Sequence, residues 1–135
     1  MEREIDSRAR ELGAFARLIG LSFTAKEDGS SQCVLMVNDN LFNPNGVLHG
    51  GVAYSMADTG MGGALHSILA ADETCATIEI NIVYLKAVTA GALVCNTKLL
   101  RKGRNIGVLE SDVENEGQLV AKALGTFSIL KRRDP

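Results

Sequence analysis

The sequence has few aromatic residues, few cysteines and prolines, and no excess of positive charge. Aromatic side chains account for 4% of the 135 residues, tryptophan is absent, and there are 2 prolines and 3 cysteines. With a formal net charge of -2, and basic residues clustered only at the end, the chain lacks the electrostatic footprint of a nucleic-acid-binding protein. Residues 131–135, which hold that cluster, are predicted to be a solvated tail.

Long hydrophobic runs are also missing. No segment approaches the roughly 18 uninterrupted apolar residues that would span a bilayer. Residues 1–10 alternate acids and bases, which excludes a secretion signal or membrane anchor at that position. We therefore expect a cytoplasmic protein with no membrane or nucleic-acid partner.

The three cysteines, Cys33, Cys75 and Cys95, show no Cys-x-x-Cys spacing, and each lies in an apolar or strand-like context. We interpret them as reduced core residues. Two histidines without a thiol pair are too few ligands for a structural zinc site. No metal site and no cofactor is expected.

What the sequence does contain fits one ordinary α+β domain over residues 1–135. Apolar residues make up 46% and charged residues 22%, which is typical of a chain that folds around a core. Apolar residues at steps of three and four predict an amphipathic helix over residues 1–20. A second, longer helix is expected over 50–70, although its several glycines weaken helix propensity by about 1 kcal/mol each. The cost suggests that another backbone approaches this helix closely. Either the helix is simply packed tightly in the core, or it is enclosed by a curved sheet.

The remaining segments are strand-like and are bounded by turn residues. Residues 21–27 and 33–37 predict a first hairpin, and four further strands are expected over 74–85, 92–101, 106–113 and 119–130 as an antiparallel meander. In the first of these four strands, apolar residues alternate with polar ones and predict one packed face: Ala76, Ile78, Ile80, Ile82 and Tyr84. One helix cannot cover six flat strands, so a bent sheet wrapped around the central helix is the economical solution.

The segment from Asn43 to Asp58 carries most of the chemical information. Turn formers lead into His49-Gly50-Gly51, where a helix is expected to begin. The unpaired N–H groups of a first helical turn favour negative charge, and two glycines let a carbonyl group approach closely, as an oxyanion site requires. The alternative is that the glycines only permit a sharp corner between loop and helix.

Asp58 is an isolated acid among small and apolar helical residues. Either it faces solvent or it is retained for chemistry, since carboxylates are seldom buried without a partner. Nine helical steps from His49 to Asp58 rotate about 180° and rise roughly 13 Å. The two therefore cannot meet in one site on one chain, and joint action needs two chains related by a twofold axis.

The pattern Asn43-x-x-Gly46-x-x-His49-Gly50-Gly51, followed by Ala57-Asp58, resembles the signature of hotdog-fold acyl-CoA thioesterases. The group it resembles contains the phenylacetate-pathway enzymes and human-type thioesterase superfamily member 2. This resemblance implies a curved sheet around one helix, an acyl-CoA substrate, and homodimers that commonly pair again into homotetramers.

The resemblance also implies roles for individual residues. Asp58 matches the nucleophile or general base, and the backbone N–H of Gly50 polarises the thioester carbonyl. Asn43 and His49 would orient substrate or water. Thr77 matches a hydroxyl that helps to place water, although a strand threonine chosen for β propensity is the simpler interpretation.

Further positions are candidates for substrate binding. Gly51 lies at the helix start, and Tyr54 replaces a phenylalanine that is usual in the family. The cations of the 101–104 connection, Arg101, Lys102 and Arg104, match a region that in relatives can approach the phosphates of CoA, but a solvated turn is an equally good interpretation. Ala87 stands where the family often has proline, which leaves the shape of that loop open.

Three functions follow as hypotheses. The leading one is hydrolysis of an acyl-CoA thioester. The second is an acyl-CoA hydratase or dehydratase with His49 as base, and the third is a non-catalytic acyl-CoA-binding module. The sequence does not decide between aromatic acyl groups, such as phenylacetyl or hydroxyphenylacetyl, and aliphatic ones.

Overall fold

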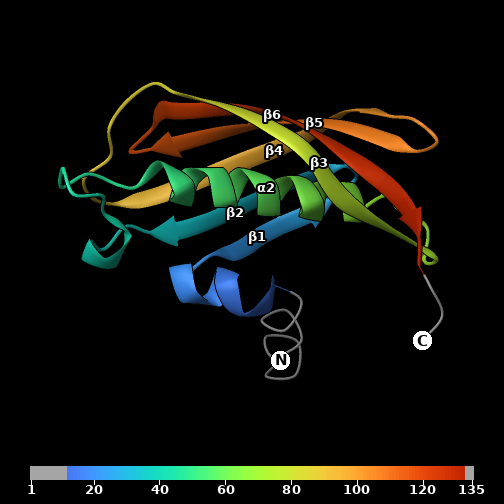
Figure 1. Cartoon of the computed structure of the whole chain (residues 1–135), viewed down its shortest axis with the longest axis horizontal. Helices are drawn as coiled ribbons and strands as arrows, with labels where there is room; N and C mark the ends of the chain where they lie inside the picture. Colours follow the sequence, from blue (N-terminus) through green and yellow to red (C-terminus); the bar gives the residue numbers. More distant parts are fainter. Residues whose placement is uncertain (1–11, 133–135) are drawn as a thin grey trace.

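The computed structural model describes residues 12–132 as one antiparallel sheet and its helices (Figure 1). The six strands are β1 (Ser22–Glu27), β2 (Ser30–Met36), β3 (Glu73–Tyr84), β4 (Ala92–Lys102), β5 (Ile106–Asn115) and β6 (Gln118–Lys131). Between β2 and β3 lie the short 3-10 helix η1 (Asp39–Leu41) and the central helix α2 (Gly50–His66). The expected strand and helix content is confirmed.

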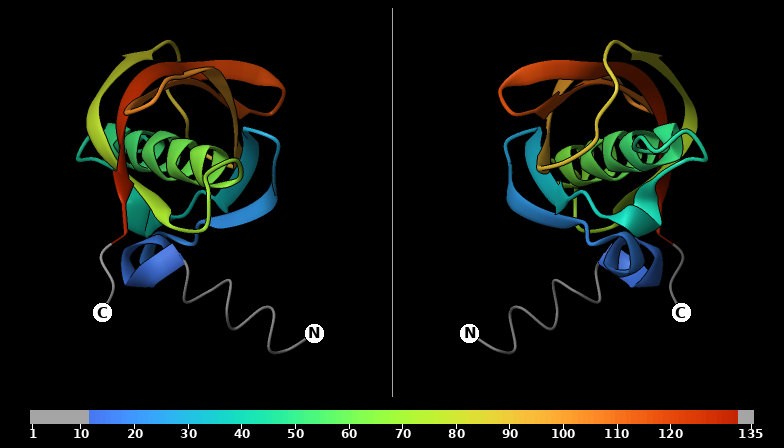
Figure 2. Two further views of the ribbon diagram at one scale, coloured as in Figure 1. Left: turned by 90° about the vertical axis from the view of Figure 1, so that its right-hand side faces the viewer. Right: turned by 90° about the vertical axis from the view of Figure 1, so that its left-hand side faces the viewer.

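The sheet curves around α2 and encloses it on most sides (Figure 2). A short helix over residues 12–19 lies outside the sheet, below β1 in Figure 1. The first part of the helix predicted over 1–20 lies outside the described residues. This arrangement confirms the predicted hotdog fold.

Helix α2 is buried on a stripe in which pairs of buried residues recur every four positions. These are Val52 and Ala53, Met56 and Ala57, Gly60 and Met61, and Ala64 and Leu65. Such spacing follows from 3.6 residues per turn. The first half of the stripe packs in one apolar cluster with β2, β4 and the 12–19 helix, and the second half packs with β5 and β6. The helix ends at His66, four residues earlier than predicted.

The strand order is β1-β2-β4-β5-β6-β3, so the predicted meander is right for β4, β5 and β6 and wrong for β3. Tight turns join β1 to β2 and β5 to β6 through Asp28-Gly29 and Glu116-Gly117, all with positive φ, as two-residue hairpins require. The connection over residues 85–91 has no such turn. It crosses the sheet, so that β4 pairs with β2 and β3 becomes an edge strand paired with β6.

Strand β3 also departs from the predicted alternation. Its register with β6 shifts between Thr77 and Glu79, a bulge that changes which residues point inward. Ile80 and Ile82 pack against the core as predicted, but Ile78 is 55% exposed. The single packed face predicted for this strand is therefore wrong on the N-terminal side of the bulge.

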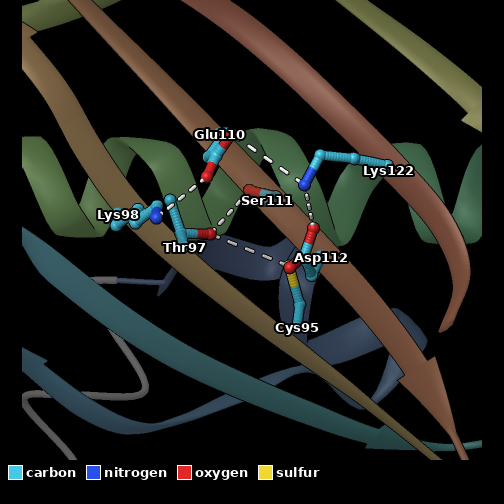
Figure 3. A network of polar contacts seen from close by, with 7 residues as sticks. All are labelled: Cys95, Thr97, Lys98, Glu110, Ser111, Asp112 and Lys122. Atoms are coloured by element: carbon cyan, nitrogen blue, oxygen red, sulfur yellow. Dashed lines mark hydrogen bonds and ion pairs between the residues drawn. The ribbon is translucent and has the colours of Figure 1, made fainter. Parts of the chain in front are cut away.

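In strands β4 and β5, side chains alternate more regularly between the outer face of the sheet and the face toward α2 (Figure 3). On the outer face, Lys98 pairs with Glu110 at 3.1 Å, and Lys122 pairs with Asp112 at 2.7 Å. On the face toward α2, the hydroxyls of Thr97 and Ser111 share a 2.6 Å hydrogen bond. The exposed ion pairs contribute little stability, whereas the buried hydroxyl pair satisfies groups that would be costly to leave unpaired.

The cysteines follow the prediction in part. Cys33 and Cys95 are opposite each other on β2 and β4 and are fully buried, while Cys75 is half-buried; none forms a disulfide. A hydrogen bond to Cys95 and burial both raise the pKa of Cys33. Its thiol is thus protonated and serves as a core group.

The predicted solvated tail is wrong at its start. Strand β6 continues to Lys131, which pairs with Asp72 at 3.0 Å, and the Arg132 side chain donates to the Glu73 carbonyl at 3.1 Å. Pairing with β3 orders this segment. Residues 133–135 lie outside the described residues, and no helix of the described part is long and apolar enough to cross a membrane.

Close packing with side chains of the sheet explains some of the glycines of α2 and not others. A Cβ on Gly60 would lie 2.8 Å from the Thr97 hydroxyl oxygen, and the Gly60 carbonyl accepts a 2.6 Å bond from Ser31. A Cβ on Gly62 would meet only a Phe127 carbon, at 3.9 Å. The first glycine is therefore required by packing and the second is not.

We predict opposite effects for two alanine substitutions in this helix. Gly60→Ala should lower the free energy of unfolding by about 1–3 kcal/mol, because the short, buried Thr97 side chain cannot move away. Gly62→Ala, the matched control, should be neutral or stabilising by up to about 1 kcal/mol through helix propensity. Urea unfolding of both variants checks this, and equal losses would contradict the packing explanation.

Candidate active site

The loop before α2 is shaped by Asn43. Its side-chain oxygen accepts hydrogen bonds from the N–H groups of Asn45 at 2.9 Å and Val47 at 3.4 Å, and its own N–H donates to the Val47 carbonyl at 2.8 Å. Gly46 completes the turn with φ of 78°, a conformation that favours glycine. Asn43 thus holds the loop, and it also lines the cleft described below.

His49 caps the first turn of α2. Its backbone is extended, and its Nδ1 accepts a 2.8 Å hydrogen bond from the Gly51 N–H. Because Nδ1 is the acceptor, the neutral ring carries its proton on Nε2. A Cβ on Gly51 would lie 2.9 Å from Nδ1, so glycine is needed for this cap.

The N–H of Gly50 is left without an acceptor among residues 12–132. The neighbouring first-turn amides are used: Gly51 donates to His49 and Val52 donates to the His49 carbonyl. An unpaired amide at a helix N-terminus, next to a half-open cleft, is a donor for a carbonyl oxygen or oxyanion. The N–H predicted from the sequence to bind an oxyanion therefore has no acceptor within the described chain, and its role stays a prediction.

The cleft beside Gly50 has a volume of about 420 Å³. The polar residues of its walls are Asn43, His49 and Lys86. Most of the wall is apolar and is formed by Leu48, Ala53, Tyr84, Leu85, Ala87, Val88, Val120 and Ala121. Tyr84 closes the side next to the helix start, and its hydroxyl donates to the Gly50 carbonyl at 2.6 Å. Ala87 lies in this wall.

Asp58 lies on α2, facing strand β3. Thr77 of that strand donates a 2.6 Å hydrogen bond to Asp58 Oδ1, so these two predicted residues are brought together. Burial and the negative charge of Asp58 raise the pKa of the nearby Cys75. Cys75 is thus a neutral thiol and not a nucleophile of this site.

The other predicted residues are not gathered around one point. Asp58 does not line the Gly50 cleft, and eight helical steps place it about 12 Å along the axis from Gly50. Tyr54 is 38% exposed on α2. Within one described chain, the acid and the oxyanion donor belong to separate places.

The 101–104 cations are also remote from the Gly50 cleft. The adjoining residues Leu99 and Gly107 lie next to Ile68 and Leu65, at the C-terminal end of α2. Arg101, Lys102 and Arg104 are exposed and do not line the Gly50 cleft.

A second cavity, of about 430 Å³, lies against the C-terminal half of α2. Phe23 and Leu12 form its apolar side, Lys26 and Arg132 bring positive charge to it, and His66 also lines it. Burial, then the charges of Arg132 and Lys26, lower the pKa of His66. His66 is therefore held neutral beside two cations.

Tyr84 was not identified as a site residue from the sequence. It was only the last apolar position of an alternating strand, and alternation says nothing about where its hydroxyl reaches. The crossing of residues 85–91 brings the end of β3 beside the start of α2. This placement depends on tertiary structure, so no local signal reveals it.

Comparison with known proteins gives consistent matches. The model of the family described as "Thioesterase superfamily" matches residues 45–122, more than half of the chain. The structure of a conserved protein from Pseudomonas aeruginosa is 37% identical, with a TM-score of 0.86, over 90% of this chain and 99% of that one. A phenylacetic acid degradation-related protein from Ralstonia eutropha is 28% identical, with a TM-score of 0.81, over 89% and 97%.

A curated relative, the 1,4-dihydroxy-2-naphthoyl-CoA hydrolase of Listeria monocytogenes, is 26% identical over 116 residues, covering 85% of this chain and 94% of the relative. The fold, the free helix-start amide and these matches agree. The chain belongs to the thioesterase superfamily, a class of thioester hydrolases.

The cap at the helix start gives a stability prediction. His49→Ala should lower the free energy of unfolding by about 1 kcal/mol, because the Gly51 N–H loses its acceptor. His49→Asn should retain most of the stability, because asparagine is a good N-cap. Thermal unfolding of the two variants checks this, and an equal loss in both would contradict the capping explanation.

Proposed function

We propose that this protein hydrolyses an acyl-CoA thioester at a site shared by two subunits, with Asp58 from one and the Gly50 N–H from the other. The observation that carries the proposal is the presence, on one helix, of a helix-start amide without an acceptor and a carboxylate about two turns further along, too far away to share its site. A twofold dimer with the two α2 helices antiparallel would bring each acid toward the partner's helix start.

Asp58 would act in one of two ways. As a nucleophile, a carboxylate oxygen attacks the thioester carbon, the C–S bond breaks, CoA leaves as thiolate and takes a proton, and water then hydrolyses the mixed anhydride. As a general base, the carboxylate removes a proton from water as that water attacks the same carbon. Thr77 holds Oδ1, which leaves Oδ2 for either step.

Gly50 would stabilise the charge that develops on the carbonyl oxygen. Its N–H is already oriented at the helix start, where the helix dipole adds to the effect. The apolar walls of the adjacent cleft, including Leu48, Val88 and Val120, suit an acyl group and would exclude water around it. Both aromatic and aliphatic acyl groups are compatible with such walls.

The exposed edge of β3 supports the dimer. This strand is 12 residues long and has a partner on one side only. It carries Ile78 and Val83, which are 55% and 59% exposed in the single chain. A long apolar edge is a site for pairing with another strand, and a second copy of β3 fits it. A further pairing of dimers into a tetramer would cover the sheet's outer face.

In such a dimer, the C-terminal end of one α2 lies toward the start of the other. The exposed cations Arg101, Lys102 and Arg104 would then approach the partner's cleft, where they could bind the phosphates of CoA. This is the proposed reason for their distance from the cleft of their own chain.

The hydratase alternative is disfavoured by the state of His49. A general base needs a free lone pair, but Nδ1 is committed to the Gly51 N–H and the other nitrogen carries the proton. A binding module without turnover would have no use for the Thr77–Asp58 pair.

Thiol release from a panel of aromatic and aliphatic acyl-CoA esters tests the function. Asp58→Ala and Asp58→Asn should each lose about 100-fold or more in kcat, because no carboxylate remains to attack or to activate water. Thr77→Val should lose about 10-fold, and Thr77→Ser, which keeps the hydroxyl, should stay near wild type. Undiminished hydrolysis in both Asp58 variants would refute the assignment.

Sedimentation equilibrium tests the proposed assembly. Wild-type protein should sediment as a dimer or tetramer, and Val83→Lys should shift it toward monomer with loss of thioesterase activity, because a charge is placed on the edge that pairs. Leu18→Lys, a matched control at a residue 84% exposed on the 12–19 helix, should change neither property. A fully active monomer would contradict the shared site.

A further inference from the structure

We propose that Tyr84 is a positioning residue that, together with His49, clamps the Gly50–Gly51 peptide and so holds in place the α-carbon that carries the Gly50 N–H. The inference rests on the proposed function for its catalytic consequence and on contacts within one chain for its geometry.

The two ends of one peptide group are held from two elements. The carbonyl of Gly50 accepts a 2.6 Å hydrogen bond from the Tyr84 hydroxyl of β3. The N–H of Gly51, which belongs to the same peptide group, donates to His49 Nδ1 at 2.8 Å. Since a peptide group is planar, bonds at both its ends oppose any rotation of that plane.

The Tyr84 ring also lies against the α-carbon of Gly50. A Cβ at this position would be 2.9 Å from the ring carbon that bears the hydroxyl and 3.0 Å from the oxygen. Glycine is therefore required here by close packing with Tyr84. A glycine is the residue with the most backbone freedom, so an external contact is needed to hold it in one conformation.

This freedom matters because the proposed oxyanion donor is the N–H on that same α-carbon. A hydrogen-bond donor accelerates the reaction only when it already points at the position where charge develops. That N–H lies on the His49–Gly50 peptide, whose carbonyl accepts from the Val52 N–H at 3.0 Å. The two peptides meet at the Gly50 α-carbon, so a displacement of the Gly50–Gly51 peptide shifts this α-carbon and carries the N–H away from its place beside the cleft. The clamp thus replaces the rigidity that the missing side chain cannot supply.

The phenol can donate this bond throughout the neutral range. Burial, and to a smaller extent the neighbouring Tyr54, raise the pKa of Tyr84. The hydroxyl is therefore protonated wherever the enzyme would work, and the Gly50 carbonyl, which has no proton to give, is its acceptor.

Tyr84→Phe tests the clamp, since it removes one oxygen atom and keeps the ring on Gly50. We expect kcat for acyl-CoA hydrolysis to fall about 10-fold while KM changes less than about twofold, because the oxyanion exists only in the transition state. The matched control is Ser31→Ala, which removes a strand hydroxyl that donates at 2.6 Å to another glycine carbonyl of α2, that of Gly60. It should lower stability and leave kcat unchanged.

A second readout does not depend on turnover. In ¹H–¹⁵N spectra of the full-length protein, Tyr84→Phe should shift the Gly51 amide resonance and speed its hydrogen exchange by about 10-fold, whereas Ser31→Ala should leave both as in wild type. An unchanged Gly51 amide in Tyr84→Phe overturns the clamp, whatever the enzyme does.

The two proposals fail in different ways. If the Gly51 amide is unchanged in Tyr84→Phe while hydrolysis still depends on Asp58, only the role of Tyr84 is overturned. A Gly51 amide that responds to Tyr84→Phe, in a protein that hydrolyses no acyl-CoA, would support the clamp and overturn the proposed function. Equal kcat in Tyr84→Phe and wild type would overturn the catalytic consequence.

Discussion

The structure depends on burying one face of a single helix inside a curved sheet. Pairs of residues every four positions of α2 enter the core, and the sheet must bend around them because one helix cannot cover six flat strands. The opposite face of α2 is only partly covered, and Asp58 on that face is half-buried and bonded to Thr77 of β3. Gly50 lies at the helix start beside the cleft, so the constraint that forms the core leaves both groups outside it.

The glycines of this helix have separate physical roles. Gly60 admits the Thr97 hydroxyl, Gly51 admits the His49 cap, and Gly50 admits the Tyr84 ring. At these three positions the absence of a Cβ is matched to one side chain from the sheet or the preceding loop, whereas Gly62 has no such close neighbour. The loss of helix propensity that these residues cause is therefore offset at specific contacts, two of which shape the helix start.

Much of this could be predicted from the sequence, where the signal is local. Strand and helix periods, the two-residue turns and the His-Gly-Gly helix start depend on neighbouring residues. The separation of His49 from Asp58 follows from helix geometry alone. The placement of β3 at the sheet edge could not be predicted, because strand order is set by pairing between distant segments.

The same limit applied to particular side chains. The bulge after Thr77 reversed the facing of Ile78, and a bulge leaves no mark in an alternating pattern. Tyr84 reaches Gly50 across 34 positions of sequence, through a crossing connection that no motif indicated. The expectation that another backbone approaches the helical glycines was wrong, since side chains of the sheet and the preceding loop do so instead.

Complementation between two inactive variants tests the central claim, that each site takes Asp58 from one subunit and the Gly50 N–H from the other. Gly50→Pro removes the N–H at a first helical position whose backbone tolerates proline. Gly50→Ala brings a Cβ against the Tyr84 ring in the same way but keeps the N–H, so it separates the loss of the N–H from the displacement of Tyr84. Unfolding and refolding a mixture of Asp58→Ala and Gly50→Pro should restore about a quarter of wild-type activity, because half the dimers are mixed and each holds one intact site. Mixed dimers without recovered activity would contradict the shared site.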